Sequence, residues 1–380
     1  MSVPHRATFA LRPQLHLAIE ADRADVLAHF DAEYGSSRAL GYPVRPDLNI
    51  AFRHVQQPTL RGGHKTVSWR VELGNPEASC LSASIELRGA PRSFGLSLVQ
   101  GYFVEPLLSI AAAREESVLL PCAAINTDEG LLLLLGRSRS GKSSLAVRAL
   151  AAGATVLGDD QAFIDAKGWC TTFPRRMRFY SDLRLTAPRA FARLTPTVRG
   201  GLFLRGAARW LTRGFVAPPV RVRIDALGEV AGAEPLCVRR VVLIERQRDI
   251  ATIQRREVAT DESVDFATTL LDEQRVKLAA AGPAWTRCVK RTRAAPYCEK
   301  LLTPRRGADA STAEMERSQS LRSPRAAPWN SGLRCWLSAR AESSAFTCRV
   351  QSAKSGRFPS RPPRGSFSVS TFILPPCIAR

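Results

Sequence analysis

The chain has 380 residues, 45% of them hydrophobic, which is enough for about two domains with buried cores. No run reaches the roughly 18 apolar residues of a membrane-spanning helix, and the N-terminus lacks the apolar stretch of a secretory signal. The net charge of +21 would suit a nucleic-acid partner, but arginine far outnumbers lysine. We interpret the charge as an arginine-rich coding background and expect neither a membrane nor a nucleic-acid partner.

Cysteines and histidines give no metal-site pattern. The nine cysteines are widely spaced and form no CxxC pair, which disfavours zinc and redox motifs. Since cytosolic thiols stay reduced, this pattern favours a cytoplasmic protein. The five histidines all precede residue 116 and are interpreted as structural: His5, His16, His29, His54 and His64.

Residues 1–115 predict a β-rich N-terminal region. Apolar segments alternate with turns, partly with the period of two that is typical of strands. The expected strands are 49–55, 65–73 and 80–87, and the expected helices are 23–34 and 102–114. We find no group of chemically active residues in this region.

Residues 116–302 predict an α/β domain that binds a nucleotide. Strand 118–125, a turn at 127–130, the fully apolar strand 131–135, helix 142–152 and strand 154–157 follow one another. A strand, loop, helix and strand in this order imply a parallel pair, and an all-apolar strand implies a sheet that is covered on both faces. The fold class is therefore a P-loop core on a mixed, largely parallel sheet.

The remainder of the chain divides at about residue 303. Before it, a strand at 238–245 and a helix at 261–281 continue the domain, and residues 173–178 are a basic loop or strand edge. Residues 303–380 are rich in Ser, Arg and Pro and lose periodicity, so we predict a disordered tail. A chain that ends at Leu302 is expected to fold like the whole.

A glycine-rich loop follows the strand at 131–135. Residues 136–143 match G-x-x-x-x-G-K-[ST] at every fixed position. In such a loop, backbone N–H groups and the next helix N-terminus surround the phosphates, the lysine reaches the β- and γ-phosphates, and the hydroxyl of the last residue coordinates Mg²⁺. The predicted residues for a nucleoside triphosphate and Mg²⁺ are Gly136, Ser138, Arg139, Ser140, Gly141, Lys142, Ser143 and Ser144.

Arg139 occupies a position that is glycine in many loops of this kind. If the position requires a positive φ, arginine costs on the order of 1 kcal/mol. Its guanidinium could instead add a bidentate phosphate contact. The sequence leaves both readings open.

Asp159 and Asp160 follow the strand at 154–157, which we expect beside the strand of the glycine-rich loop. One carboxylate there can hold Mg²⁺, and the other can accept the proton of an attacking hydroxyl. We predict Asp159 as the base and Asp160, with Ser143, as the metal-linked residue. Asp159, Asp160 and Lys142 are thus the catalytic candidates, against the alternative of a simple turn or helix cap.

Residues 136–146 and 153–160 resemble the catalytic core of the HPr kinase/phosphorylase family. The Phe-Pro-Arg-Arg segment at 173–176 is similar to the proline-basic segment of HPr-kinase-like proteins from bacterial gene clusters. The resemblance implies a P-loop kinase core, with ATP and Mg²⁺ at Lys142 and Ser143 and a serine hydroxyl activated by the Asp pair. Relatives in the family form oligomers, so a homo-oligomer is among the expectations.

Three departures from the family's pattern narrow the expected activity. Ala154 replaces a histidine, Arg139 replaces a glycine, and the later glycine-rich segment linked to phosphorolysis is absent. The prediction is an ATP-dependent serine kinase that transfers the γ-phosphoryl group to a serine or other hydroxyl of a protein or peptide, and the departures disfavour HPr as the acceptor. An ATPase or nucleotide-dependent switch, and a degenerate scaffold without turnover, are the alternatives. Neither an LSGGQ-like motif nor N-K-x-D is present, which disfavours ABC ATPases and GTPases.

Two further features remain open. Residues 241–245 form an apolar strand that ends in Glu245, as in ATPases that polarise water with glutamate, although a solvated strand end is the preferred interpretation. Arg175, Arg176 and Arg178 could contact phosphate or an acidic substrate, although such charged runs are usually solvated.

Overall fold

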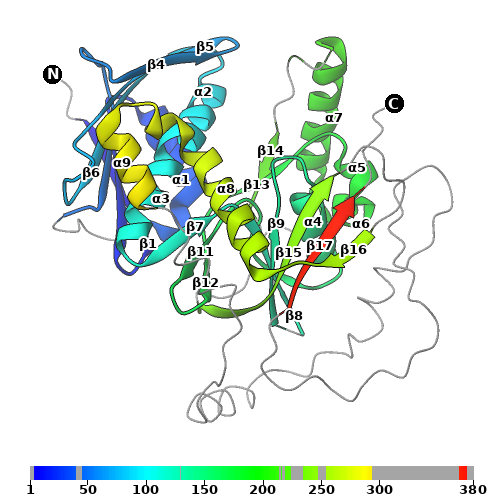
Figure 1. The fold of residues 1–380 in the computed structure, drawn as a ribbon. Helices are drawn as coiled ribbons and strands as arrows, with labels where there is room; N and C mark the ends of the chain where they lie inside the picture. The colour runs from blue at the N-terminus through cyan, green and yellow to red at the C-terminus, as the bar shows by residue number, and fades with distance from the viewer. Residues whose placement is uncertain are drawn as a thin grey trace, which may run out of the picture.

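The computed structural model describes residues 4–39, 45–128, 130–213, 215, 219–223, 234–246, 254–292 and 368–374. Within these residues, the chain forms two main β-sheets that lie next to each other, with helices around and between them (Figure 1). The mixed α/β class expected from the sequence is confirmed.

The N-terminal unit is built on a six-stranded sheet. Its spatial order is β1 (His5–Arg12), β2 (Leu15–Ala21), β3 (Leu48–Phe52), β6 (Leu81–Gly89), β5 (Val67–Leu73) and β4 (Leu60–His64). The pairs β2–β3 and β3–β6 are parallel, whereas the other pairs are antiparallel. The helices of the unit are α1 (Ala24–Tyr34), the short η1 (Gly35–Ser37), α2 (Arg92–Val99), the π-helical η2 (Gln100–Val104) and α3 (Glu105–Arg114).

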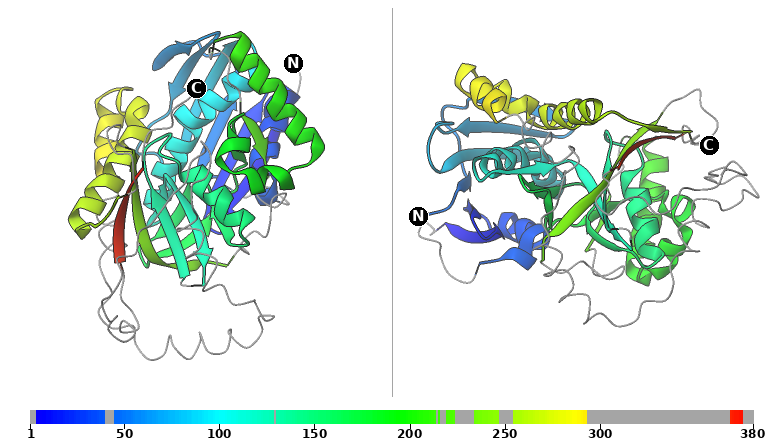
Figure 2. Two further views of the ribbon diagram at one scale, coloured as in Figure 1. Left: turned by 90° about the vertical axis from the view of Figure 1, so that its right-hand side faces the viewer. Right: turned by 60° about the horizontal axis from the view of Figure 1, so that its bottom comes forward.

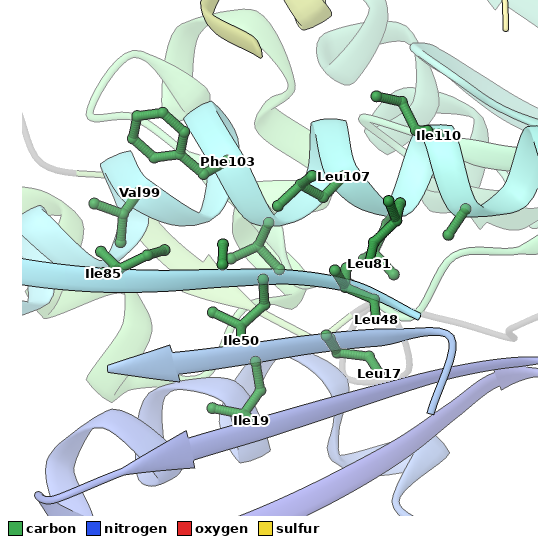
Figure 3. Packing of buried hydrophobic residues seen from close by; sticks show 14 of the residues in the cluster. Leu17, Ile19, Leu48, Ile50, Leu81, Ile85, Val99, Phe103, Leu107 and Ile110 are labelled. Atoms are coloured by element: carbon green, nitrogen blue, oxygen red, sulfur yellow. The ribbon is translucent and has the colours of Figure 1, made fainter. Parts of the chain in front are cut away.

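The stretch α2–η2–α3 is the central helix of this unit. It lies on one face of the sheet, and its apolar side chains pack against those of β2, β3 and β6 (Figure 3). Residues 92–114 are long and apolar enough to cross a membrane, but 78% of their most apolar window is buried inside the protein. A core helix that is enclosed on most sides is as apolar as a membrane helix, because most of its side chains face apolar surroundings instead of water.

Two helices that come much later in the chain cover the outer side of this central helix. They are α8 (Thr260–Ala279) and α9 (Pro283–Arg291), and their residues Leu278, Trp285, Cys288 and Val289 belong to the same buried cluster as Phe103 and Leu107. Arg275 of α8 is fully buried and donates to the backbone and hydroxyl oxygens of Ser109. The N-terminal unit is therefore completed by residues beyond 260.

The second sheet carries the glycine-rich loop. Its main order is β10 (Thr155–Gly158), β8 (Cys122–Thr127), β9 (Gly130–Leu135), β15 (Leu236–Arg246), β12 (Trp169–Thr172), β11 (Ala162–Asp165) and β7 (Ser117–Leu120). Beside β15 lie β17 (Ser368–Leu374) and then β16 (Gln254–Glu257), and a separate hairpin joins β13 (Met177–Phe179) to β14 (Val220–Val222).

The expectation of a largely parallel sheet is wrong. Among the described strands of this sheet, only β9–β15 and β15–β17 pair in parallel. The sequence predicted a βαβ unit with adjacent parallel strands, but the turn at 127–130 makes β8 and β9 an antiparallel hairpin. Strand β8 then separates β10 from β9, so the strand before Asp159 is not the neighbour that was expected.

Both faces of this sheet are covered, as the apolar strand predicted. Leu134 points into a core with α4 (Lys142–Ala151), while Leu133 and Leu135 point into a core with α8. The helices α5 (Leu183–Thr186), α6 (Pro188–Arg193) and α7 (Pro196–Leu211) lie on the α4 side. In the right-hand view of Figure 2, these helices and α8 lie on opposite sides of β15.

The prediction of a wholly disordered tail is corrected at one place. Residues Ser368–Leu374 form β17, which pairs in parallel with β15 and antiparallel with β16. The segment reads Ser-Val-Ser-Thr-Phe-Ile-Leu, and β-branched and aromatic residues favour strands, which the Ser/Arg/Pro composition of the tail as a whole had obscured. The rest of residues 303–380 lies outside the described residues.

Removal of β17 is therefore expected to destabilise the sheet, contrary to the expectation from sequence. A chain that ends at Leu302 exposes the backbone edge of β15, and each kcal/mol lost lowers the melting temperature by about 2–4 °C in a domain of this size. A deletion of residues 375–380 is the control, because it leaves β17 intact. Identical melting curves for the whole chain and the chain ending at Leu302 would contradict the pairing.

Candidate functional site

The glycine-rich loop connects β9 to α4, which is the context that its sequence pattern requires. A Cβ atom at Gly136 would lie 2.5 Å from Oγ of Ser140 and 2.8 Å from the carbonyl oxygen of Ile244, so only glycine fits there. Gly141 has a φ of 107° at the start of α4, a conformation that L-residues rarely adopt. Steric constraints on the backbone therefore explain why both fixed positions of the pattern are glycine.

Arg139 is the strained residue of this loop. Its φ is +67°, in the left-handed region, and its side chain is exposed. Ser138 beside it is also exposed, whereas Ser140 is buried. The backbone at position 139 therefore has the conformation for which glycine is preferred, and arginine bears the cost.

Arg139→Gly is expected to stabilise the folded chain by about 0.5–1 kcal/mol. Glycine adopts the left-handed conformation without strain, and part of this gain is offset by the greater entropy of the unfolded chain. Urea unfolding measures the change. Arg137→Gly is the matched control, because residue 137 precedes the left-handed position and Arg137 forms an exposed ion pair with Glu273 of α8. Equal destabilisation by both substitutions would show that position 139 is unstrained.

Lys142 is folded back over its own loop. Its Nζ donates hydrogen bonds to the carbonyl oxygens of Gly136 and, at 3.1 Å, of Arg137. Burial lowers the pKa of Lys142, although Asp160 and Asp159 oppose this effect. The ammonium group is thus held by backbone carbonyl oxygens of the loop itself.

The two aspartates lie at the same edge of the sheet as this loop. Strand β10 is antiparallel to β8, which is antiparallel to β9, so β10 and β9 run in the same direction and end at the same edge. A Cβ at Gly158 would lie 2.4 Å from the carbonyl oxygen of Gln161, so a tight turn follows the strand. Because β8 lies between them, β10 and β9 are not neighbours, but Asp159 and the glycine-rich loop still lie at the same edge of the sheet.

Asp159 is a buried carboxyl group with an incomplete set of partners. It is 5% exposed, and neither of its carboxyl oxygens has a hydrogen-bond partner of ordinary geometry. Burial, and then the charge of Asp160, raise the pKa of Asp159 to about 7, although Ser143, Lys142 and Arg175 act in the opposite direction. Such a group exchanges its proton near neutral pH, which is the range a general base needs.

Asp160 has a different environment. Its side chain is 35% exposed, and its Oδ2 lies 3.5 Å from a guanidinium nitrogen of Arg175. The same nitrogen donates a 3.0 Å hydrogen bond to Glu105. The two aspartates are adjacent in sequence but differ in environment. Asp159 is buried and incompletely hydrogen-bonded, whereas Asp160 is ion-paired and partly accessible. Different environments for paired carboxyls are a frequent basis for different roles.

Sequence reasoning found nothing of chemical interest in residues 1–115, and the structure corrects this. Gln100 donates to the Tyr34 hydroxyl and to Glu105, and its amide oxygen lies 3.0 Å from His29. Glu105 continues the network to Arg175. Polar residues within the otherwise apolar helix 92–114 were the available signal, because a buried polar group requires a partner. The N-terminal unit thus reaches the Asp160 side of the site.

A second buried carboxylate lies nearby. Oε1 of Glu33 accepts hydrogen bonds from Arg176 at 2.8 Å and from Arg221 at 3.0 Å. Burial tends to raise the pKa of Glu33, but these arginines outweigh it and lower the pKa. His29 is 8% exposed and burial lowers its pKa to about 4, so the imidazole is neutral at physiological pH.

The residues of this edge fit a magnesium ion that is held together with a phosphate chain. No cluster of three or more His, Cys, Asp or Glu side chains suited to a metal occurs among the residues that the structure describes. Mg²⁺ commonly binds through one or two protein ligands, substrate phosphates and water. The accessible Asp160 and the half-buried Ser143 would be such ligands.

Comparisons with known proteins do not assign this chain to a family. No protein-family model matches this chain, and a search of curated proteins finds no match.

Proposed function

We propose that this chain is an ATP-dependent kinase that transfers the γ-phosphoryl group to a serine or other hydroxyl of a protein or peptide. The observation that carries the proposal is the buried carboxyl of Asp159, with its raised pKa, beside Ser143 and Lys142 at the end of a strictly patterned glycine-rich loop. A buried carboxyl with incomplete hydrogen bonding is costly, and a catalytic role would account for the cost.

The proposed roles follow from the two environments. Lys142 leaves the carbonyl oxygens of its loop and binds the β- and γ-phosphates, while backbone N–H groups of the loop surround the β-phosphate. Ser143 and Asp160 would hold Mg²⁺, which would supply positive charge next to the phosphates. The oxygen of the acceptor hydroxyl bonds to the γ-phosphorus, and Asp159 accepts the proton of that hydroxyl. The bond between the γ-phosphorus and the bridging oxygen breaks, and ADP leaves with that oxygen.

The proposal is tested by transfer of label from γ-³²P-ATP. Purified chain is incubated with Mg²⁺ and serine-containing peptides, and the products are separated into phosphopeptide, inorganic phosphate and labelled chain. Phosphopeptide or labelled chain supports the kinase, since a kinase that meets a weak acceptor also modifies accessible hydroxyls of its own chain. Failure to bind ATP would instead favour a degenerate scaffold.

Nucleotide hydrolysis without an acceptor is the second candidate, and Glu245 favours it. Strand β15 is the parallel neighbour of β9, and the carbonyl oxygen of Ile244 approaches Gly136. Glu245 therefore lies at the sheet edge where β9 passes into the glycine-rich loop, a position from which a glutamate can polarise water. Inorganic phosphate as the only labelled product, lost in Glu245→Gln and retained in Asp159→Asn, would favour this candidate over the kinase.

A further inference from the structure

A buried ion pair joins the N-terminal unit to the edge of the second sheet where Asp160 lies. Arg175 comes from the loop between β12 and β13, and its guanidinium reaches Glu105, the first residue of α3. The side chains of Arg175 and Glu105 are only 8% and 3% exposed. A residue of the N-terminal unit is thus one side chain away from the proposed magnesium ligand.

The guanidinium of Arg175 is shared between two carboxylates. One of its terminal nitrogens donates a 3.0 Å hydrogen bond to Oε2 of Glu105 and lies 3.5 Å from Oδ2 of Asp160. The second distance is longer than an ordinary hydrogen bond, so Arg175 is held mainly by Glu105. Asp160 is the more loosely held carboxylate, and its side chain, at 35% exposed, is the one that a cation from solution can reach.

Glu105 is fixed from its other side by a buried hydrogen-bond network. Its Oε1 accepts a 2.9 Å hydrogen bond from Gln100, which is fully buried. The same amide nitrogen donates to the Tyr34 hydroxyl, and the amide oxygen of Gln100 lies 3.0 Å from Nε2 of His29. Both carboxyl oxygens of Glu105 therefore have partners, and the network keeps this carboxylate oriented toward Arg175.

The charges of this trio determine what Asp160 can do. Glu105 and Asp160 are two carboxylates that share one guanidinium, so Asp160 retains negative charge that would attract a divalent cation. Without the charge of Glu105, a cation would have to compete with Arg175 for Asp160. Because a buried charge that loses its partner is costly, Arg175 would then hold Asp160 more firmly.

We propose that Glu105 is a positioning residue for the magnesium site: it keeps Arg175 paired, so that Asp160 can exchange the guanidinium for a divalent cation. This inference rests on the proposed function, because it takes Asp160 as a residue that would hold Mg²⁺. It adds that the site is incomplete without the N-terminal unit, which supplies Glu105 and the network behind it.

Binding of Mn²⁺ tests the inference without turnover. The electron paramagnetic resonance signal of free Mn²⁺ measures how much of the ion the whole chain binds, with and without a non-hydrolysable ATP analogue. Comparison of the parent with Asp160→Asn identifies binding that depends on Asp160. We expect Glu105→Gln to weaken this binding by about tenfold, because residues behind a metal ligand commonly have effects of this size. A parent without Asp160-dependent binding in either condition would overturn the inference.

A double variant separates positioning from support of the fold. Arg175→Met removes the guanidinium that competes for Asp160, so Glu105→Gln combined with Arg175→Met should recover most of the Mn²⁺ affinity of the parent. Replacement of both partners leaves no unpaired buried charge from this pair. If Glu105 only supports the fold, the double variant binds Mn²⁺ no better than Glu105→Gln, and the positioning role is rejected.

Glu33→Gln is the matched control. Glu33 is a buried glutamate of the same unit, but its hydrogen bonds come from Arg176 and Arg221. Its replacement removes the same charge and should leave Mn²⁺ binding unchanged, whereas equal losses in Glu33→Gln and Glu105→Gln would contradict a specific role of Glu105. Should Glu105→Gln not fold, Glu105→Asp keeps the charge but lengthens the contact with Arg175, and unaltered Mn²⁺ affinity in that variant would contradict the inference.

The same measurements distinguish this inference from the proposed function. Mn²⁺ binding that depends on Asp160 and Glu105, without phosphoryl transfer, supports the positioning role and rejects only the kinase. Phosphoryl transfer with equal Mn²⁺ affinity in the parent and Glu105→Gln retains the kinase and rejects the positioning role.

Discussion

Asp159→Asn is expected to lower the rate of phosphoryl transfer by about 10²- to 10⁴-fold, the usual effect of removing a general base. The asparagine side chain has almost the same shape but cannot accept the proton of the acceptor hydroxyl. ATP affinity should change little, because the proton moves only during transfer. Rate measurements at saturating ATP, with isothermal titration of ATP and Mg²⁺ on the same preparation, separate the two quantities.

Asp160→Asn is the matched comparison, because it removes one carboxylate from the next residue. Its proposed role is to hold Mg²⁺, so it should weaken Mg²⁺-dependent ATP binding in addition to turnover. If the two variants exchange these effects, the roles of the aspartates are the reverse of those proposed. If both retain full turnover and affinity, the pair is only a turn and the kinase proposal fails.

Asp159→Asn also has an expected effect on stability without nucleotide or Mg²⁺. The folded-state pKa of about 7 lies above the ordinary value near 4. The folded parent therefore holds a proton that the unfolded chain has lost, and its stability falls as pH rises from about 4 to about 7. Asparagine has no such proton, so the melting temperature of the variant should rise relative to the parent across this window. A constant difference would contradict the raised pKa.

Lys142→Ala is expected to weaken ATP binding by roughly 100-fold or more with the fold intact. The lysine is the fixed cation of the G-x-x-x-x-G-K-[ST] pattern, and hydrogen bonds to charged groups contribute about 1.5–3 kcal/mol each. Its present partners are the carbonyl oxygens of Gly136 and Arg137, which belong to the loop itself. Isothermal titration with ATP and Mg²⁺ measures the loss, and equal affinity in variant and parent would end the nucleotide-binding claim.

Lys290→Ala provides the control for this measurement. Lys290 is an exposed lysine in the last turn of α9, away from the glycine-rich loop. The same change in net charge there should leave ATP affinity unaltered. A similar loss in both variants would indicate long-range electrostatic attraction by a basic protein and not a specific phosphate contact.

Local sequence patterns predicted the elements of the site but not their assembly. The glycine-rich loop, α4 and β10 were predictable because steric demands on Gly136 and Gly141 and the apolar run before them act over a few residues. The order of the strands was not predictable from these patterns, because the β8–β9 hairpin places β8 between β10 and β9, and the βαβ pattern contains no such strand. Glu105 and Glu33 were missed because their partners, Arg175 and Arg176, lie at least 70 residues away in sequence.

The packing of α8 and α9 against the central helix has a consequence for folding during synthesis on the ribosome. The first sheet and the central helix emerge early, but their outer cover ends only at Arg291. At about 5–20 residues per second, roughly seven to thirty seconds pass between the emergence of residue 114 and that of the start of α8. During this interval the outer side of the central helix lacks the cover that α8 and α9 provide. We therefore expect the nascent chain to be aggregation-prone on this side until its own late helices cover it.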